Sequence, residues 1–289
     1  GRCVMHEAPM PVSLAALGKV LQEKFGTFDP TQSKAEQEER AEKMRKYVAR
    51  RAHYSVIIHE MGHSIGMRHN FVSSSDSWGY RPQYWQLRTK NGAITAPCED
   101  LQDVGTNCVG ARYYDPVTEE EDDQMIWLWM HSSVMDYAGE LSQDMIGLGV
   151  YDFAAARMFY GDVVAVHADP TYAAGTARGK GMLSKMDSFG GILGLYYEIG
   201  DTEIHYSQLQ GAFELISDCE VIENVNYWKP ANWNEELDGV WNPLFDGLIV
   251  KVDGQYTRCK QQPVDYVNWN ELSMPASNQQ PSYYGGGRS

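Results

Sequence analysis

The segment from Ser33 to Ile65 constrains this chain most, because it contains no proline and a single glycine, Gly62. Ser33 and Glu36 fit a capping box, in which the serine side chain accepts from the helix backbone and the glutamate reaches back to the cap. We therefore predict one long helix, which Gly66 can end in a left-handed turn. The charged first half is expected to face solvent, and the apolar second half (AHYSVIIHEMGHSIG) is expected to be buried.

The end of that helix carries the sequence HEMGHSIGMRH, which begins at His59. His59 and His63 are four residues apart, so both imidazoles project from one face and can bind one metal ion. Gly66 lets the chain reverse, which can bring His69 to a third position on the ion. Glu60 lies about 100° round the helix, beside the ion rather than on it, where it can take a proton from bound water.

The spacing of this motif is more specific than HExxH alone, which occurs in unrelated helices. With 27 glycines and 8 histidines in 289 residues, a glycine at +7 and a histidine at +10 coincide by chance in roughly 1 case in 400. Three neutral imidazoles leave an open coordination site on a zinc ion, which lowers the pKa of bound water to about 7. The alternative is that these histidines merely pack. The remaining histidines have no ligand-like spacing and are expected to be core or surface residues: His6, His53, His131, His167 and His205.

The long motif HExxHxxGxxH resembles that of the metzincin clan of zinc metalloendopeptidases. These enzymes have a methionine turn beneath the metal, and SSVMDY (Ser132 to Tyr137) is similar to it. The resemblance makes Met135 the turn methionine and Gly66 the residue that turns the chain toward the third ligand. A tyrosine two residues after that methionine is similar to astacins and serralysins, which implies that Tyr137 is a reversible fifth ligand and donates to the tetrahedral intermediate. Without the motif, Met135 and Tyr137 would be read as ordinary core residues.

The resemblance covers roughly residues 34–161 and is closest to large secreted bacterial zinc proteases with an HExGHxxGxRHN motif. Asn70, after the third histidine, differs from the residue that astacins, serralysins, adamalysins and matrixins have there. The implied fold is α+β, with a metzincin-like catalytic domain over residues 1–170 and a smaller mixed extension over 171–289. The extension either packs on the catalytic domain or forms an independent binding module.

Metzincins have a mostly parallel sheet before the active-site helix, whereas the 58 residues before His59 are predicted to be mainly helical. Arg2 to His6 is the only strand candidate there. We expect that the sheet is missing or that an upstream segment of the same precursor supplies it.

Other elements follow from local patterns. Residues 73–117 are rich in loop-forming residues and predict a long irregular segment. Thr118 and Glu121 form a second capping box, and the acidic run 119–123 fits a helix start rather than a calcium site. The last predictions are a helix over 12–24, an apolar helix over Met125–His131, a helix over Phe153–Tyr160 capped by Asp152 and ended by Gly161, and a hairpin over Gly247–Cys259 that turns at Asp253-Gly254.

The cysteines indicate an oxidising compartment if they pair. Cys98 with Cys108 and Cys219 with Cys259 are the predicted disulfides, Cys3 is the odd residue, and five buried thiols are the alternative. With a start at Gly1 rather than methionine, this favours a processed precursor and a secreted or periplasmic location.

The charge balance of 24 basic against 39 acidic residues gives a net charge of −15, which argues against a nucleic-acid partner. No apolar run approaches the ~20 residues that a membrane span needs. The sequence therefore predicts a secreted zinc endopeptidase acting on protein or peptide substrates, with one catalytic zinc ion and no indicated calcium. A zinc-bearing scaffold without turnover is the alternative.

Overall fold

The computed structural model describes residues 12–71, 73, 76–96, 108–109, 118–137, 143–167, 210, 215–261 and 264–268. The strand predicted at Arg2–His6, Cys3 and the predicted domain boundary after residue 170 lie outside these residues.

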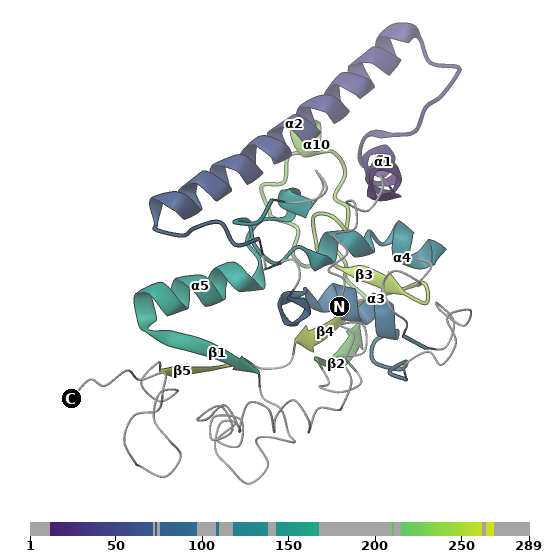
Figure 1. Ribbon diagram of the computed structural model, residues 1–289. Coiled ribbons are helices and arrows are strands. Elements are labelled where there is room, and N and C mark those ends of the chain that lie inside the picture. The colour runs from purple at the N-terminus through teal and green to yellow at the C-terminus, as the bar shows by residue number, and fades with distance from the viewer. Residues whose placement is uncertain are drawn as a thin grey trace, which may run out of the picture.

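Two helices, α1 (Val12–Phe25) and α2 (Lys34–Ser64), form the N-terminal part. Figure 1 shows α2 as one long helix along the edge of the molecule, joined to α1 by a loop at its far end. The predicted capping box is confirmed, because Glu36 N donates to Ser33 Oγ at 3.3 Å and Ser33 N donates to the Glu36 carboxylate at 2.8 Å. Gly66 follows the helix with φ of 93°, the left-handed conformation that the sequence predicts.

The predicted exposure to solvent is correct for the first half of α2 and wrong for the second half. The first half is solvated as expected, with exposed ion pairs such as Lys43–Glu39 and Arg45–Glu42. The second half is not buried, and this prediction was wrong. Only one flank of this half packs against other described elements, so five apolar side chains are 40–61% exposed: Tyr54, Val56, Ile57, Met61 and Ile65.

The segment predicted to be irregular contains a helix that the sequence reading missed. Helix α3 (Pro82–Thr89) follows a 3-10 turn, η2 (Ser77–Gly79). Proline at the first helical position is favourable, because its missing N–H would be unpaired there in any case. Six of the eight α3 residues are buried, so α3 is a core element without a polar face and lacks the helical periodicity that would have revealed it.

Helix α4 (Glu119–Asp123) begins with the predicted capping box, in which Thr118 N donates to Glu121 at 2.9 Å. The apolar α-helix predicted next is instead a 3-10 helix, η4 (Ile126–Met130). The reason is that Met125 takes a left-handed conformation, with φ of 53°, which separates the two elements. The prediction that this apolar run belongs to the core is confirmed, since Leu128 and Trp129 are fully buried.

A further 3-10 turn, η5 (Gln143–Ile146), precedes helix α5 (Val150–Gly161). The predicted start of this helix was late. Gly149 occupies the cap position, and Asp152 lies at the third helical position, from which its carboxylate accepts from Gly149 N at 2.8 Å. Asp152 therefore caps the helix from inside it.

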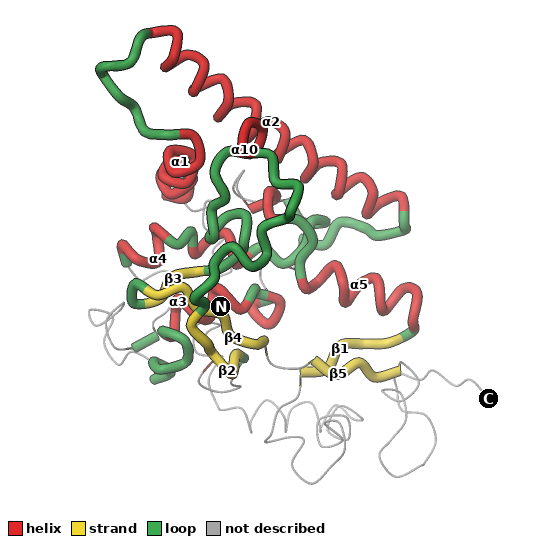
Figure 2. Tube along the Cα trace, turned by 180° about the vertical axis from the view of Figure 1, so that it is seen from behind, coloured by secondary structure: helices red, strands yellow, loops and turns green. Residues whose placement is uncertain are grey.

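Two antiparallel sheets complete the described structure. Strand β2 (Ile216–Val221) and strand β3 (Val250–Val252) flank β4 (Gln255–Gln261), while β1 (Val163–His167) pairs with β5 (Val264–Asn268). The three-stranded sheet lies against α3, and the two-stranded sheet lies beside α5 (Figure 2). The β3–β4 hairpin is confirmed, with Asp253 and Gly254 both at positive φ in the turn.

One of the predicted disulfides is present, between Cys219 and Cys259. Cys108 is also disulfide-bonded, but Cys98 lies outside the described residues, so that pairing stays a prediction.

The largest cluster of buried side chains draws on both ends of the chain. It combines residues of α1, α2, α3 and η4 with residues of the C-terminal segments, among them Leu17, Tyr47, Trp85, Trp129, Phe245 and Val250. The short helix α10 (Glu235–Asp238) lies against α2 at its margin. Within the part of the chain that the structure describes, no helix combines the length and the apolar composition that crossing a bilayer requires.

Candidate metal centre

Three histidines from α2 and the loop after it converge on one point. His59 and His63 lie on the same face of the last turns of α2. Beyond the helix, Gly66 N donates to His63 O and Met67 N donates to Gly62 O, which folds the chain back. This reversal brings His69 Nε2 to 3.1 Å from His59 Nε2 and to 3.1 Å from His63 Nε2.

The donor set fits a zinc ion. Zinc–nitrogen bonds of 2.0–2.1 Å in a tetrahedral site place neighbouring ligand atoms about 3.4 Å apart, close to the two observed separations. His59 Nδ1 lies 2.6 Å from Val134 O, and His63 Nδ1 lies 3.0 Å from Met67 O. A carbonyl can only accept, so both Nδ1 atoms donate, and Nε2 is the nitrogen that each ring turns toward its neighbours.

Glu60 is exposed and lies on the flank of α2 next to the three histidines. Among the described residues it is not one of the side chains whose ligand atoms converge there; only His59, His63 and His69 do so. The role of Glu60 beside an ion stays a prediction.

Met135 packs against α2 at Gly62, the residue that directly precedes His63. It is 1% exposed and packs with Met67 and Val134 against the helix. A Cβ atom on Gly62 would lie 2.4 Å from Met135 Sδ, so only glycine lets the methionine approach the helix this closely. Asn70 N donates to Met135 O at 3.0 Å, which ties the third-histidine loop to the same turn.

The sequence patterns do not predict these roles of Gly62 and Asn70. The one glycine within the long helix is the signal that could have identified the close approach. No sequence signal predicts the hydrogen bond from Asn70 N to Met135 O, because any residue but proline can donate through its backbone.

Tyr137 lies beside the trio and is 65% exposed. Its ring centroid is 4.7 Å from that of His69 and 6.0 Å from that of His59. Phe71 closes the aromatic group, 5.1 Å from Tyr137 and 5.4 Å from His69. The structure therefore brings together five of the predicted site residues: His59, His63, His69, Met135 and Tyr137.

The other histidines lie elsewhere or outside the described side chains. His53 is exposed on α2, and His131 is 1% exposed in the core. His6 and His205 lie outside the described residues, and of His167 only the backbone in β1 is described.

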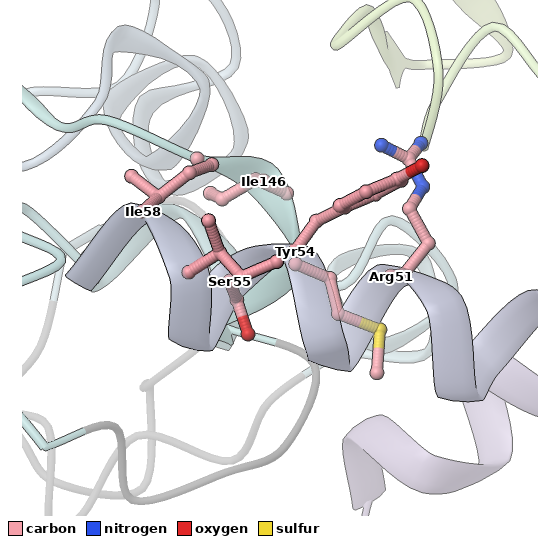
Figure 3. A pocket seen from close by; sticks show the side chains of 8 residues that line it. Arg51, Tyr54, Ser55, Ile58 and Ile146 are labelled. Carbon is pink, nitrogen blue, oxygen red and sulfur yellow. The ribbon is translucent and has the colours of Figure 1, made fainter. Parts of the chain in front are cut away.

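A cavity of about 280 Å³ lies between α2 and η5, close to the histidines along the helix. Tyr54, Ser55 and Ile58 line it from α2, and Ile146 lines it from the opposite side (Figure 3). Ile58 immediately precedes His59 and also packs against the group around Met135. The cavity is thus largely apolar and adjoins the candidate metal centre.

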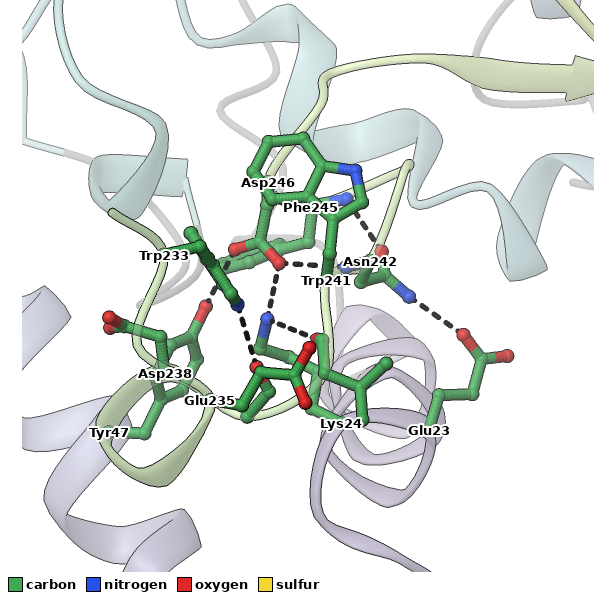
Figure 4. Close-up of polar contacts among 12 residues, drawn as sticks. Glu23, Lys24, Tyr47, Trp233, Glu235, Asp238, Trp241, Asn242, Phe245 and Asp246 are labelled. Atoms are coloured by element: carbon green, nitrogen blue, oxygen red, sulfur yellow. Dashed lines mark hydrogen bonds and ion pairs between the residues drawn. The ribbon is translucent and has the colours of Figure 1, made fainter. Parts of the chain in front are cut away.

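A second polar cluster, which we call the lysine cluster, joins α1 and α2 to the C-terminal segment (Figure 4). Its members are Lys24, Tyr47, Arg51, Asn242 and Asp246. Lys24 and Asp246 form an ion pair whose side chains are 0% and 1% exposed. Lys24 Nζ also donates to Val240 O at 3.0 Å.

Every oxygen of the Asp246 carboxylate has partners. Oδ1 accepts from Arg51 at 2.9 Å and from Tyr47 at 3.1 Å, and Oδ2 accepts from Lys24 and from Asn242 N. Burial lowers the pKa of Lys24, against the opposing attraction of Asp246. The Lys24–Asp246 pair at the centre of the cluster is buried and all its charged atoms have protein partners, so we assign the cluster a structural role.

Comparison of the chain with protein-family models, with curated proteins and with solved structures gave no match.

Proposed function

We propose that this chain is a zinc-dependent endopeptidase of the metzincin type. The observation that carries the proposal is the convergence of three Nε2 atoms from His59, His63 and His69, two of them on rings whose other nitrogen donates to a backbone carbonyl. A donor set of three neutral imidazoles with an open side is typical of catalytic rather than structural zinc sites.

A zinc ion bound there supplies Lewis acidity, which lowers the pKa of coordinated water to about 7 and polarises a carbonyl. In the proposed reaction, Glu60 takes a proton from the water whose oxygen attacks the carbonyl carbon of the scissile peptide bond. The same carboxylic acid then gives the proton to the leaving nitrogen as the C–N bond breaks. Because Glu60 is exposed beside the trio, a substrate can reach it.

Tyr137 is proposed to assist at the carbonyl oxygen. Its ring contacts His69, and a phenol at this edge of the site can donate a hydrogen bond as negative charge develops on that oxygen. The open cavity beside Ile58 offers an apolar surface next to the reacting groups.

The disulfide between Cys219 and Cys259 supports the proposal that the protein works in an oxidising compartment, outside the cell or in the periplasm. Its substrates are proposed to be proteins or peptides.

The test is digestion of a peptide library by the full chain, with zinc and with a chelator, together with zinc analysis of the protein. We expect one zinc ion per chain and hydrolysis that the chelator abolishes. Glu60→Gln should retain the zinc and lose about 10²- to 10⁴-fold in rate, the usual contribution of a general base. Zinc binding without hydrolysis in the unmodified protein would instead show the non-catalytic scaffold, and no zinc binding would overturn both.

A further inference from the structure

A buried carboxylate on α5 is connected to the first histidine of the trio by a continuous path of hydrogen bonds. Asp152 is 3% exposed, although it lies only at the third position of its helix. Of the hydrogen bonds that the Asp152 carboxylate accepts, only the one from Gly149 N caps the helix. Its other two reach back to the methionine turn: Oδ1 accepts from Ser133 Oγ at 2.6 Å, and Oδ2 accepts from Val134 N at 3.0 Å.

The path continues through one peptide group. The Ser133 hydroxyl, which donates to Asp152, accepts from Met135 N at 3.0 Å. Met135 N and Val134 O belong to the same peptide group, and Val134 O accepts from His59 Nδ1 at 2.6 Å. Each donor along the path from His59 to Asp152 therefore points the same way, and hydrogen bonds aligned in this manner strengthen one another.

The negative charge at the end of the path is held in place by its surroundings. Arg81 attracts Asp152 electrostatically, and its guanidinium donates to Leu148 O at 2.7 Å in the loop before α5. Burial lowers the pKa of Arg81 to about 10, so its charge is retained at neutral pH. The carboxylate is thus held by hydrogen bonds to the turn at Met135 and lies within the electrostatic influence of Arg81.

His63 has a different environment. Its Nδ1 donates to Met67 O, in the short loop directly after α2. The two rings on α2 are therefore oriented by different devices: His63 by its own loop, and His59 by a carboxylate that lies 93 residues further along the chain.

We infer that Asp152 is a positioning residue for the metal ligand His59, acting through Ser133 and the peptide group between Val134 and Met135. This inference rests on the metal site proposed above. The relay fixes the orientation of the His59 ring and keeps its proton on Nδ1, so that Nε2 is the nitrogen presented to the metal. Groups that orient a metal-bound histidine in this way typically change metal affinity by 10- to 100-fold when they are removed.

The experiment measures zinc affinity of the full chain by titration against a competing chelator. Asp152→Asn keeps the size of the side chain but can accept through only one oxygen, so we expect zinc to bind 10- to 100-fold more weakly. Ser133→Ala breaks the path and leaves the bonds of Asp152 to Val134 N and Gly149 N, so it should also weaken binding. Because both variants interrupt one path, the double variant should bind no more weakly than Asp152→Asn alone.

Glu121→Gln is the matched control. Glu121 is another buried carboxylate that caps its helix and pairs with an arginine, Arg88. Its substitution should lower stability and leave zinc affinity unchanged. With cobalt(II) in place of zinc, the visible absorption band should shift in Asp152→Asn and stay unchanged in Glu121→Gln.

The outcomes are distinguishable. If the unmodified protein binds no zinc, the proposed metal site is wrong. If it binds zinc, and the folded Asp152→Asn and Ser133→Ala variants bind it equally well, the relay is overturned while the metal site stands. Should Asp152→Asn fail to fold, Ser133→Ala decides, because it leaves the capping role of Asp152 intact.

Discussion

The histidine trio and the lysine cluster are both polar groups assembled around α2, yet they differ in what satisfies them. In the lysine cluster, each oxygen of Asp246 accepts from groups of the protein itself, and the ion pair with Lys24 is fully buried. In the trio, two rings are fixed by backbone carbonyls on one side, while the Nε2 atoms face one another at a partly exposed surface.

This difference indicates what each group does. A buried charge with all its partners in place contributes to the integrity of the fold and offers nothing to a ligand. In the trio, His69 Nε2 lies 3.1 Å from each of the other two Nε2 atoms, an arrangement that could hold a cation. A shifted pKa, such as the lowered pKa of Lys24, can thus mark a structural ion pair rather than a functional site.

The largest effect on stability is expected from Asp246→Asn. It leaves the buried ammonium of Lys24 without its counter-ion and should lower the free energy of unfolding by about 3–5 kcal/mol. Lys24→Met should cost less, because the carboxylate keeps Arg51 and its other donors. Urea denaturation measures both, with Asp123→Asn on the surface as a control that leaves the midpoint unchanged. If Asp246→Asn were no more damaging than the control, the cluster would not have a structural role.

His63→Ala is expected to weaken zinc binding strongly while changing the stability of the metal-free protein little. Zinc affinity should fall at least 100-fold, which corresponds to about 2.8 kcal/mol. The metal-free protein should lose less than about 1 kcal/mol of stability, because the side chain is exposed. Titration with zinc and denaturation in the presence of chelator measure the two quantities. His53→Ala, on the same helix, is the control, and equal zinc affinity in both variants would remove His63 from the site.

A smaller change in stability is expected where α2 packs against Met135, next to the three histidines. In Gly62→Ala the new Cβ meets Met135 Sδ, so either the buried methionine side chain or the helix must shift, at a cost of about 1–3 kcal/mol. Gly18→Ala in α1 is the matched control, because a Cβ there meets no atom within 4 Å; it should stabilise the protein by about 0.5–1 kcal/mol. Thermal unfolding compares them. Effects of the same sign would show that Gly62 is not needed for the approach of Met135.

Several elements could be predicted because their signals are local. The capping boxes at Ser33 and Thr118 and the turn at Asp253 involve residues within a few positions of one another, and all three are confirmed. The convergence of His59, His63 and His69 also has a local signal, since a helix of fixed pitch followed by a glycine turn brings the three residues together. Sequence spacing is enough to predict these features, although tertiary contacts such as that between Asn70 N and Met135 O also hold the His69 loop in place.

The errors of prediction lie where distant contacts decide the outcome. Helix α3 has no polar face because it is covered on nearly all sides, and the second half of α2 has apolar side chains that no described element covers. Periodicity reports the pattern of side chains along an element, but it does not report which neighbours arrive to cover them.

The sequence by itself therefore determined the long helix, its end at Gly66 and the three histidines that these two features bring toward one another. Only the tertiary structure decided that Met135 closes on Gly62 and that Asp152 is linked to His59 through the methionine turn. The physical reason is the sequence distance over which the interactions act. Helix pitch and capping involve residues within a few positions of one another. Close packing of Met135 and the hydrogen-bond relay require groups far apart in the chain to meet within a few ångströms.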